Sequence, residues 1–392
     1  MHKRRKKLRY KNILILISML LITLIGTVFF LYLFDVFKNN DDNGETIVEP
    51  LSEPPVITYD YLKQGGLFEL PITGATGFSA ISQELLDSPS VDANIITILS
   101  SGQGFVIIEE ADGWWYIEFN GFKGWVLNQN CLINLPDILP SIIYDNTNAY
   151  LSKLKSSGID IPNITGKVLY NSFYYSERFE EEMYVVPVSY TMAFKISAAQ
   201  QAALKDGNTL IIYEAYRPYD VQKLIVENLS ELAENDSIVM TGITTPPWSI
   251  NWFIATGYSN HQRGSAIDVS LGKVISNETK ITGNYKYIDI KEYNEYTMPT
   301  EIHELSISSA IFQSPVTSLS DSAWLDSIPS SGMNIEALLL QKYCTDAGLT
   351  PLSSEWWHFN DLSITNTLIE IKSIGDYHIL GNFSEKPVII ID

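Results

Sequence analysis

Cysteine is nearly absent from this chain of 392 residues, which contains only Cys131 and Cys344. Two cysteines form at most one disulfide, so a disulfide framework is excluded as the source of stability. We expect two buried thiols, with a single bridge as the alternative. Hydrophobic residues make up 45% of the sequence, enough to build a sizeable core. The length suggests two folded domains with additional segments.

Positive charge is also scarce, because 26 lysines and arginines stand against 46 acidic residues. The formal net charge is −20, and it is unevenly distributed. Residues 1–38 carry +7, so the rest of the chain carries −27. A surface this acidic repels phosphate backbones, which excludes nucleic acid as a partner of the main body.

One long stretch, residues 12–34, has no charged residue at all. Its 23 residues are enough to cross a bilayer. Seven basic residues precede it, which predicts a cytoplasmic tail over residues 1–11. We therefore expect an uncleaved, single-pass anchor in the cell membrane, with the N-terminus cytoplasmic and the body extracytoplasmic. A cleaved signal peptide is the alternative, and it also places the body outside the cytosol.

Residues 35–63 are polar, acidic and rich in proline, a composition typical of a linker. Short apolar runs separated by turn residues come next, over 64–135, and predict a small all-β domain. The expected strands are 95–99, 104–108, 114–119 and 124–127. The segments 107–117 and 120–126 (NGFKGWV) resemble bacterial SH3-type domains of cell-wall proteins. This resemblance implies either a packing module or a domain that binds peptidoglycan.

The remaining residues, 136–392, mix helical and strand-like patterns. Helices are expected over 197–206, 219–234 and 335–347, and strands over 210–215 and 266–271. Elements of both kinds alternate with long polar loops, which predicts an α+β domain.

Histidine is scarce too, with five residues in the chain, and two of them lie in motifs that contain other potential metal ligands or catalytic groups. His261 and Asp268 flank Gly264, where a turn would let both reach one metal ion. Asp268 lies in an apolar run, where an unpaired carboxylate is costly unless a metal or another cation compensates it. His358 follows Glu355 by three residues among aromatic side chains, which offers a third ligand and a carboxylate to deprotonate water.

Arg217 follows an expected strand and is well placed to hold an oxyanion. Each motif alone also fits an ordinary structural role. Together, the segments 216–218 (YRP), 259–268 and 355–358 resemble the zinc D-Ala-D-Ala peptidases, which include vancomycin-resistance dipeptidases and D,D-carboxypeptidases. The resemblance covers about residues 140–365. It implies an α+β zinc peptidase domain. In our prediction this domain follows the SH3-like barrel and the N-terminal transmembrane helix described above.

The resemblance also implies roles for individual residues. His261, Asp268 and His358 would bind one zinc ion, with Glu355 as the general base. Arg217 would stabilise the oxyanion, and Ser259 would help to hold the substrate. The implied reaction is hydrolysis of D-Ala-D-Ala, either as the free dipeptide or at the end of a peptidoglycan stem peptide.

One segment departs from the family pattern. Dipeptidases of the family carry an aspartate that binds the free ammonium group of the dipeptide, and Thr297 stands in the corresponding segment here. Glu295 and Glu301 are candidates to replace it. A substrate with a blocked amine would tolerate Thr297 better. His303, in the same region, is expected to be structural or at the surface, with a position at the edge of the cleft as the alternative.

Two further functions remain open from the sequence alone. An endopeptidase that cleaves within stem peptides or crossbridges would use the same site, and a wall-binding protein with an inactive peptidase domain would use none of it. A serine enzyme is disfavoured, because the S-x-x-K motifs at Ser152 and Ser270 have no accompanying S-D-N or K-T-G element. The absence of H-E-x-x-H also argues against thermolysin-type enzymes.

Overall fold

The computed structural model describes residues 57–364, 368, 371 and 373–387. All of them belong to one compact unit, Ile57–Asp392. The predicted tail, the predicted membrane anchor and most of the predicted linker lie outside the described residues. Among the residues that are described, no helix has both the length and the apolar character needed to cross a membrane.

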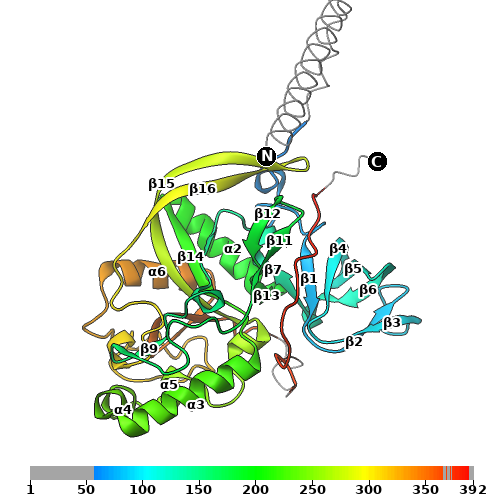
Figure 1. Ribbon diagram of the computed structural model, residues 1–392. Helices are drawn as coiled ribbons and strands as arrows, with labels where there is room; N and C mark the ends of the chain where they lie inside the picture. The colour runs from blue at the N-terminus through cyan, green and yellow to red at the C-terminus, as the bar shows by residue number, and fades with distance from the viewer. Residues whose placement is uncertain (1–56, 365–367, 369–370, 372, 388–392) are drawn as a thin grey trace, which may run out of the picture. The chain divides into compact units, whose positions relative to one another are not determined.

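The N-terminal part of the unit is a β-sheet that contains the four predicted strands (Figure 1). Its strands are β1 (Thr76–Ser79), β2 (Gln83–Leu86), β3 (Ile95–Leu99), β4 (Gly104–Ala111), β5 (Trp114–Phe119), β6 (Phe122–Leu127) and β7 (Cys131–Asn134). Tight turns at Asp112-Gly113 and Asn120-Gly121 join β4 to β5 and β5 to β6. All four of these turn residues have positive φ, which is the reason for glycine and asparagine or aspartate there.

The core of this sheet forms from alternating side chains of its strands. Phe105, Ile107, Trp115 and Ile117 are fully buried. The Trp115 ring lies 4.9 Å from the ring of Tyr190, a residue of the C-terminal part. The tryptophan motif therefore joins the all-β region to the C-terminal part of the unit.

A strand from the C-terminal part extends the same sheet. The three-residue strand β13 (Pro187–Ser189) pairs with β7, so that the sheet order is β13-β7-β1-β4-β5-β6-β2-β3. The sequence pattern did not predict this pairing, and it makes the two predicted domains share one sheet.

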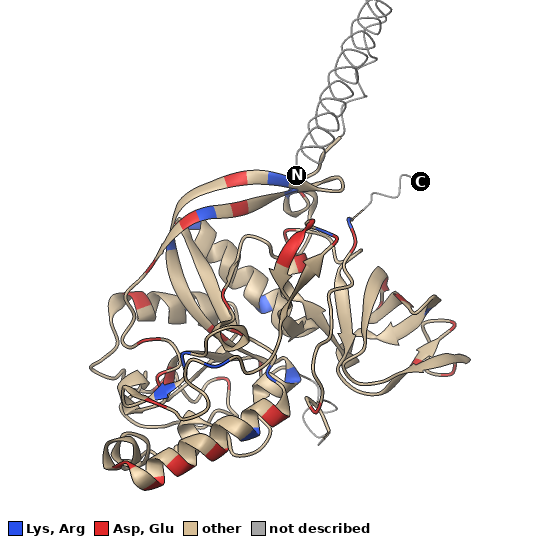
Figure 2. Ribbon diagram, in the orientation of Figure 1, with Lys and Arg blue, Asp and Glu red and all other residues tan. Residues whose placement is uncertain are grey.

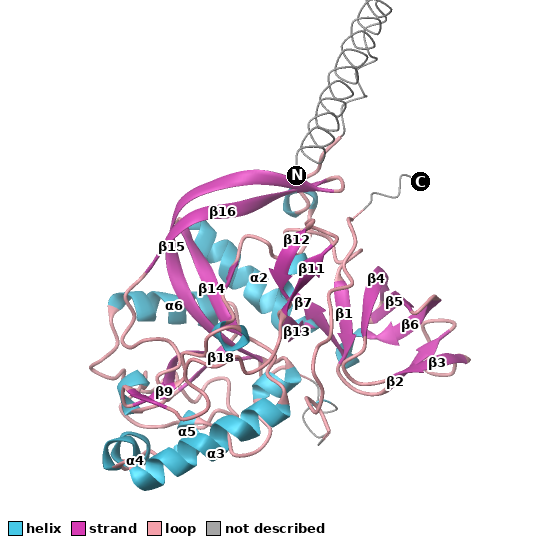
Figure 3. Ribbon diagram, in the orientation of Figure 1, coloured by secondary structure: helices cyan, strands magenta, loops and turns pink. Residues whose placement is uncertain are grey.

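A second sheet forms the centre of the C-terminal part (Figure 3). Its strands are β8 (Ile143–Tyr144), β14 (Asn208–Glu214), β15 (Ala266–Thr282), β16 (Tyr285–Glu295), β17 (Thr350–Leu352) and β18 (Glu355–Asn360). They are arranged in the order β17-β18-β15-β14-β8, with β16 paired to β15. Two short hairpins are separate from it: β9 (Lys155–Ser156) with β10 (Ile159–Asp160), and β11 (Phe173–Ser176) with β12 (Glu181–Tyr184).

The described helices are α2 (Tyr190–Lys205), α3 (Tyr219–Asn235), α4 (Ser237–Thr244), α5 (Ile250–Phe253) and α6 (Ile335–Asp346). The three predicted helices are present among them, which agrees with an α+β domain. Helix α2 starts seven residues before the predicted position, because Ser189 caps it by accepting a hydrogen bond from the Met192 amide.

Strand β15 is also longer than predicted. It passes the expected end at Leu271 and forms a two-stranded ribbon with β16. Basic and acidic residues alternate along this ribbon (Figure 2). Lys280 lies 2.6 Å from Asp289, and Lys291 lies 2.8 Å from Glu278, so opposite charges pair across the two strands.

Candidate metal and active site

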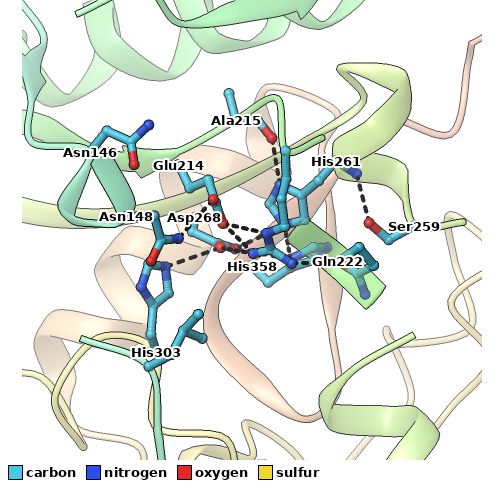
Figure 4. Close-up of polar contacts among 12 residues, drawn as sticks. Asn146, Asn148, Glu214, Ala215, Gln222, Ser259, His261, Asp268, His303 and His358 are labelled. Atoms are coloured by element: carbon cyan, nitrogen blue, oxygen red, sulfur yellow. Dashed lines mark hydrogen bonds and ion pairs between the residues drawn. The ribbon is translucent and has the colours of Figure 1, made fainter. Parts of the chain in front are cut away.

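The predicted metal ligands lie on three segments that are adjacent in space. Asp268 is the third residue of β15 and stands directly opposite His358 of β18. His261 lies on a short helical turn, Asn260–Arg263, immediately before β15. Figure 4 shows the three side chains converging. Residues that are distant in the sequence therefore meet because β15 and β18 pair.

The three side chains form a compact, buried donor set. Nδ1 of His358 lies 3.0 Å from Oδ1 of Asp268 and 3.2 Å from Nε2 of His261. One ligand atom from each residue lies within 4.8 Å of the other two. Two imidazole nitrogens and a carboxylate oxygen are a ligand set that suits Zn²⁺ at catalytic sites. The residues present thus fit a single metal ion.

The turn that carries His261 is fixed by its own backbone. Ser259 caps it, with its hydroxyl accepting a hydrogen bond from the His261 amide at 3.3 Å, and Gln262 completes a capping box. Gly264 ends the turn in the left-handed region, at φ 63°. Nδ1 of His261 lies 2.6 Å from the Ala215 carbonyl, so Nε2 is the nitrogen left for a metal.

Electrostatics favour the metal-binding form of Asp268 and of His261, whereas the metal-free site favours the protonated ring of His358. Burial alone would raise the pKa of Asp268, but His261 and hydrogen bonds from His303 and His358 hold that pKa well below its ordinary value. Burial lowers the pKa of His261 and so favours the neutral ring. For His358, contacts with Asp268 outweigh burial and raise the pKa.

Glu355 lies beside the donor set. Its Oε2 is 3.6 Å from Nδ1 of His358. Burial raises the pKa of Glu355 to about 8, the negative charge of Asp268 adds to this rise, and His358 and Arg217 oppose it. A carboxyl group that titrates near neutral pH is able to accept a proton from water and to return it.

Arg217 is held rigidly at the other side of Asp268. Its Nε donates to Glu214 Oε2 at 2.8 Å, a second guanidinium nitrogen also donates to that oxygen, and Nη1 donates to Gln222 at 2.8 Å. The other carboxylate oxygen of Glu214 accepts hydrogen bonds from Asn148 and Tyr170. Arg217 keeps N–H groups for a ligand, because a guanidinium has five.

Sequence reasoning did not assign Glu214 and His303 to the site. His303 was expected to be structural or at the surface, yet it is 1% exposed, and its Nε2 lies 3.2 Å from Oδ2 of Asp268. Its backbone is in the left-handed region, at φ 65°. Glu214 stood in the motif that contains Arg217 and received no role. Only the motif position of Glu214 offered a signal in the sequence.

Glu214, Asp268 and His303 are also close enough together to hold a metal. Arg217 already donates to Glu214, however, and its guanidinium lies 3.5 Å from Asp268. A second cation there would be repelled by this permanent charge. The arrangement therefore favours one ion, on His261, Asp268 and His358.

A cavity of about 690 Å³ opens onto the donor set. Arg217, Ser259, His303 and Glu355 line it together with the three donors, and Trp252, Ile254 and Leu319 extend it with apolar surface. Its volume lies in the range of sites for drug-sized ligands. The cavity therefore has room for more than a dipeptide.

Thr297 is not at this cavity. It lines a second cavity of about 550 Å³, together with Glu295 and Glu301. The Thr297 carbonyl accepts a hydrogen bond from Asn334 at 2.6 Å. Thr297, Glu295 and Glu301 thus line the second cavity, and His303 is the residue of this segment that lines the first. Which residue would bind a substrate amine stays a prediction.

Comparisons with known proteins match both parts of the chain. Residues 163–367 match the model of a family described as D-ala-D-ala dipeptidase, and residues 85–130 match a bacterial SH3 domain. The chain is 27% identical over 168 residues to the D-alanyl-D-alanine dipeptidase of Escherichia coli, which covers 43% of this chain and 61% of that protein.

A second relative matches the N-terminal part. It is the "Putative N-acetylmuramoyl-L-alanine amidase YrvJ" of Bacillus subtilis, 42% identical over 60 residues, which are 15% of this chain and 11% of that protein. The chain therefore spans less than two thirds of the length of each of these relatives.

Proposed function

Because the chain belongs to the D-Ala-D-Ala dipeptidase family of peptidases, with a bacterial SH3 domain before the peptidase part, we propose that it is a zinc-dependent D,D-carboxypeptidase. Its substrate would be the terminal D-Ala-D-Ala of peptidoglycan stem peptides. The observation that carries this proposal is the buried set of His261, Asp268 and His358, with Glu355 3.6 Å from His358.

The three donors would hold zinc. When bound, zinc would polarise the scissile carbonyl of the substrate and lower the pKa of a water molecule. Glu355 would take a proton from the attacking water and pass it to the leaving amine. Arg217, locked by Glu214, would donate to the oxyanion that develops at the scissile carbonyl. Ser259 would help to hold the substrate.

The charges in the cavity support a substrate with a blocked amine. Its acidic lining residues are Asp268, Glu355 and Asp361. The first belongs to the donor set and the second is the proposed base. The third is paired with Lys195 at 2.5 Å. Among the described lining residues, therefore, no carboxylate remains for an α-ammonium group next to the scissile bond. The free dipeptide has this group, whereas in a stem peptide the same nitrogen is part of an amide.

The free dipeptide is the second candidate substrate, favoured by the 27% identity to a D-alanyl-D-alanine dipeptidase. We further propose an extracytoplasmic enzyme anchored by residues 12–34, with peptidoglycan as a partner of the SH3 domain. An acidic, exported peptidase with a wall-type domain would meet stem peptides more often than free dipeptide.

Digestion of purified peptidoglycan fragments tests the proposal. The full chain with zinc should convert stem pentapeptides to tetrapeptides and release D-alanine, leaving crosslinked dimers intact. Glu355→Gln should lower the release by about 10²- to 10⁴-fold, whereas Glu301→Gln, a control in the second cavity, should not change it. Dimers split into monomers without D-alanine would indicate an endopeptidase. A wild-type chain that binds zinc and fragments but produces neither change would support the inactive wall-binding alternative.

A further inference from the structure

Two parts of the chain outside the peptidase match (residues 163–367) pack against the loops that carry His261 and Arg217. One part is the N-terminal sheet. The other is residues 373–387, which we call the C-terminal strap. The strap runs beside β1 (Figure 1), where the Phe383 amide donates to Thr76 at 3.0 Å and the Glu385 amide donates to Gly74 at 2.7 Å.

The N-terminal sheet contacts the His261 turn directly. The Gly264 carbonyl accepts a hydrogen bond at 2.7 Å from the amide of Ser189, in β13, a strand inside the peptidase match that pairs with β7 of the N-terminal part. A Cβ atom at Gly264 would lie 2.7 Å from a methyl carbon of Leu132, a fully buried residue of β7. The turn therefore lies directly on the sheet, with no space between them.

The strap contacts the Arg217 loop. The Tyr216 hydroxyl donates to the Tyr377 carbonyl at 2.5 Å, and the two tyrosine rings stack with centroids 5.2 Å apart. The Tyr219 amide donates to the Gly375 carbonyl at 2.9 Å. The residues on both sides of Arg217 are thus bonded to the strap.

Gln262 links the two loops, and the strap presses against it. Its side-chain amide donates to the Arg217 carbonyl at 3.0 Å, and its oxygen accepts from the Ser259 amide at 2.5 Å. A Cβ atom at Gly375 would lie 2.4 Å from Cβ of Gln262. Only glycine allows this approach.

One apolar cluster lies among these contacts. It combines residues of the N-terminal part, the segment before β13, the Arg217 loop, and the segments before and within the strap: Phe78, Ala80, Leu132, Val185, Tyr216, Ile364, Leu368, Ile374 and Ile379. Close-packed interiors transmit displacement, and a shift of about 1 Å in a catalytic group costs on the order of 100-fold in rate.

We propose that the SH3-like sheet and the C-terminal strap form a buttress that positions Arg217 and His261 relative to Asp268 and His358. The inference rests on the proposed function for its effect on turnover. Leu132, Tyr216, Gln262 and Gly375 are then positioning residues. The sheet of the N-terminal part, through β1 and β7, is then part of the catalytic architecture, whether or not it also binds the cell wall.

The first test compares Gly375→Ala with Gly113→Ala in the full chain. Both glycines have positive φ, 78° and 87°, so both variants carry similar backbone strain. Nothing lies within 4 Å of a Cβ at Gly113, whereas one at Gly375 displaces Gln262. We expect Gly375→Ala to lower kcat for D-alanine release by about 10- to 100-fold and to weaken zinc affinity, and Gly113→Ala to change neither.

The second test guards against unfolding of Gly375→Ala. Tyr216→Phe removes only the hydrogen bonds that the Tyr216 hydroxyl donates to the strap, and it keeps the ring. Tyr144→Phe removes an equivalent hydroxyl, which donates to the Leu139 carbonyl at 2.9 Å away from the strap. We expect a several-fold lower kcat and weaker zinc binding for Tyr216→Phe alone. The buttress is refuted if Gly375→Ala and Tyr216→Phe match their controls within twofold. If the wild type releases no D-alanine, the proposed function fails, and zinc affinity still decides the buttress.

Discussion

Asp268 and His358 face each other across the β15–β18 pair, with Oδ1 of the aspartate 3.0 Å from Nδ1 of the histidine. The pairing of two strands, rather than a loop, sets this distance. A metal held there would bind the native chain in preference to the unfolded one, and it would therefore stabilise the fold.

Metal removal should therefore lower stability. At free zinc of about 1,000 times Kd, the metal contributes about 4 kcal/mol to the free energy of unfolding. Chelation should remove this contribution from the wild type, and added zinc should restore it. Asp268→Asn should show a much smaller difference with and without zinc, measured by denaturant unfolding. Equal responses of both proteins would place the metal elsewhere.

Arg217→Lys should lower kcat/KM by about 10²- to 10³-fold, because lysine keeps the charge but cannot bond Glu214 and Gln222 while still donating to an oxyanion. Zinc affinity should stay within a few-fold of the wild type, since Arg217 is not among the proposed ligands. Steady-state kinetics and a chelator-competition titration measure the two quantities. Unchanged kinetics would remove Arg217 from the reaction.

His303→Phe should weaken zinc binding by about 10- to 100-fold, because it removes the hydrogen bond that orients the proposed ligand Asp268. His303→Asn is the matched variant: asparagine tolerates the positive φ at this position and keeps a donor. Its affinity should lie between those of the phenylalanine variant and the wild type. Identical affinities for all three proteins would show that the contact has no role in metal binding.

Glu69 predicts a pH dependence of stability. It is 6% exposed and accepts hydrogen bonds from Ser141 and Gln201. Burial raises the pKa of Glu69 from its ordinary 4.5 to about 7, so the native chain binds this proton more tightly than the unfolded chain does. The contribution of Glu69 to stability is therefore largest below pH 4.5 and is lost as the pH rises to about 7.

The Glu69→Gln variant isolates this effect. Between about pH 4.5 and 7.5, the wild type should lose about 3 kcal/mol of unfolding free energy relative to the variant. Urea denaturation of both proteins at the two pH values measures it. Parallel pH profiles would contradict the assignment.

Much of the site could be predicted from local sequence. The spacing of His261 and Asp268 around Gly264, and the Glu355–His358 pair, named all three donors that the structure brings together. The resemblance to both families is confirmed by the matches. The short strands of the all-β region were visible because their turns carry aspartate-glycine and asparagine-glycine pairs.

Other features depend on contacts that local patterns do not encode. Strand β13 has three residues, too few for a periodic signal, yet it extends the first sheet. The outer half of β15 is largely exposed and polar, so its sequence pattern is typical of a loop. It forms a strand because it pairs with β16. His303 reaches Asp268 only through the tertiary fold, so its short polar segment suggested a place at the edge of the cleft only as the less favoured interpretation.

The central claim is that the buried donor set hydrolyses D-Ala-D-Ala at the end of a blocked peptide. Its most direct test is D-alanine release by the zinc-loaded full chain from an N-acylated peptide ending in D-Ala-D-Ala and, separately, from the free dipeptide. We predict a higher kcat/KM for the acylated peptide and a loss of about 10²- to 10⁴-fold in Glu355→Gln with zinc still bound. Faster hydrolysis of the free dipeptide, or full activity of Glu355→Gln, would contradict the account.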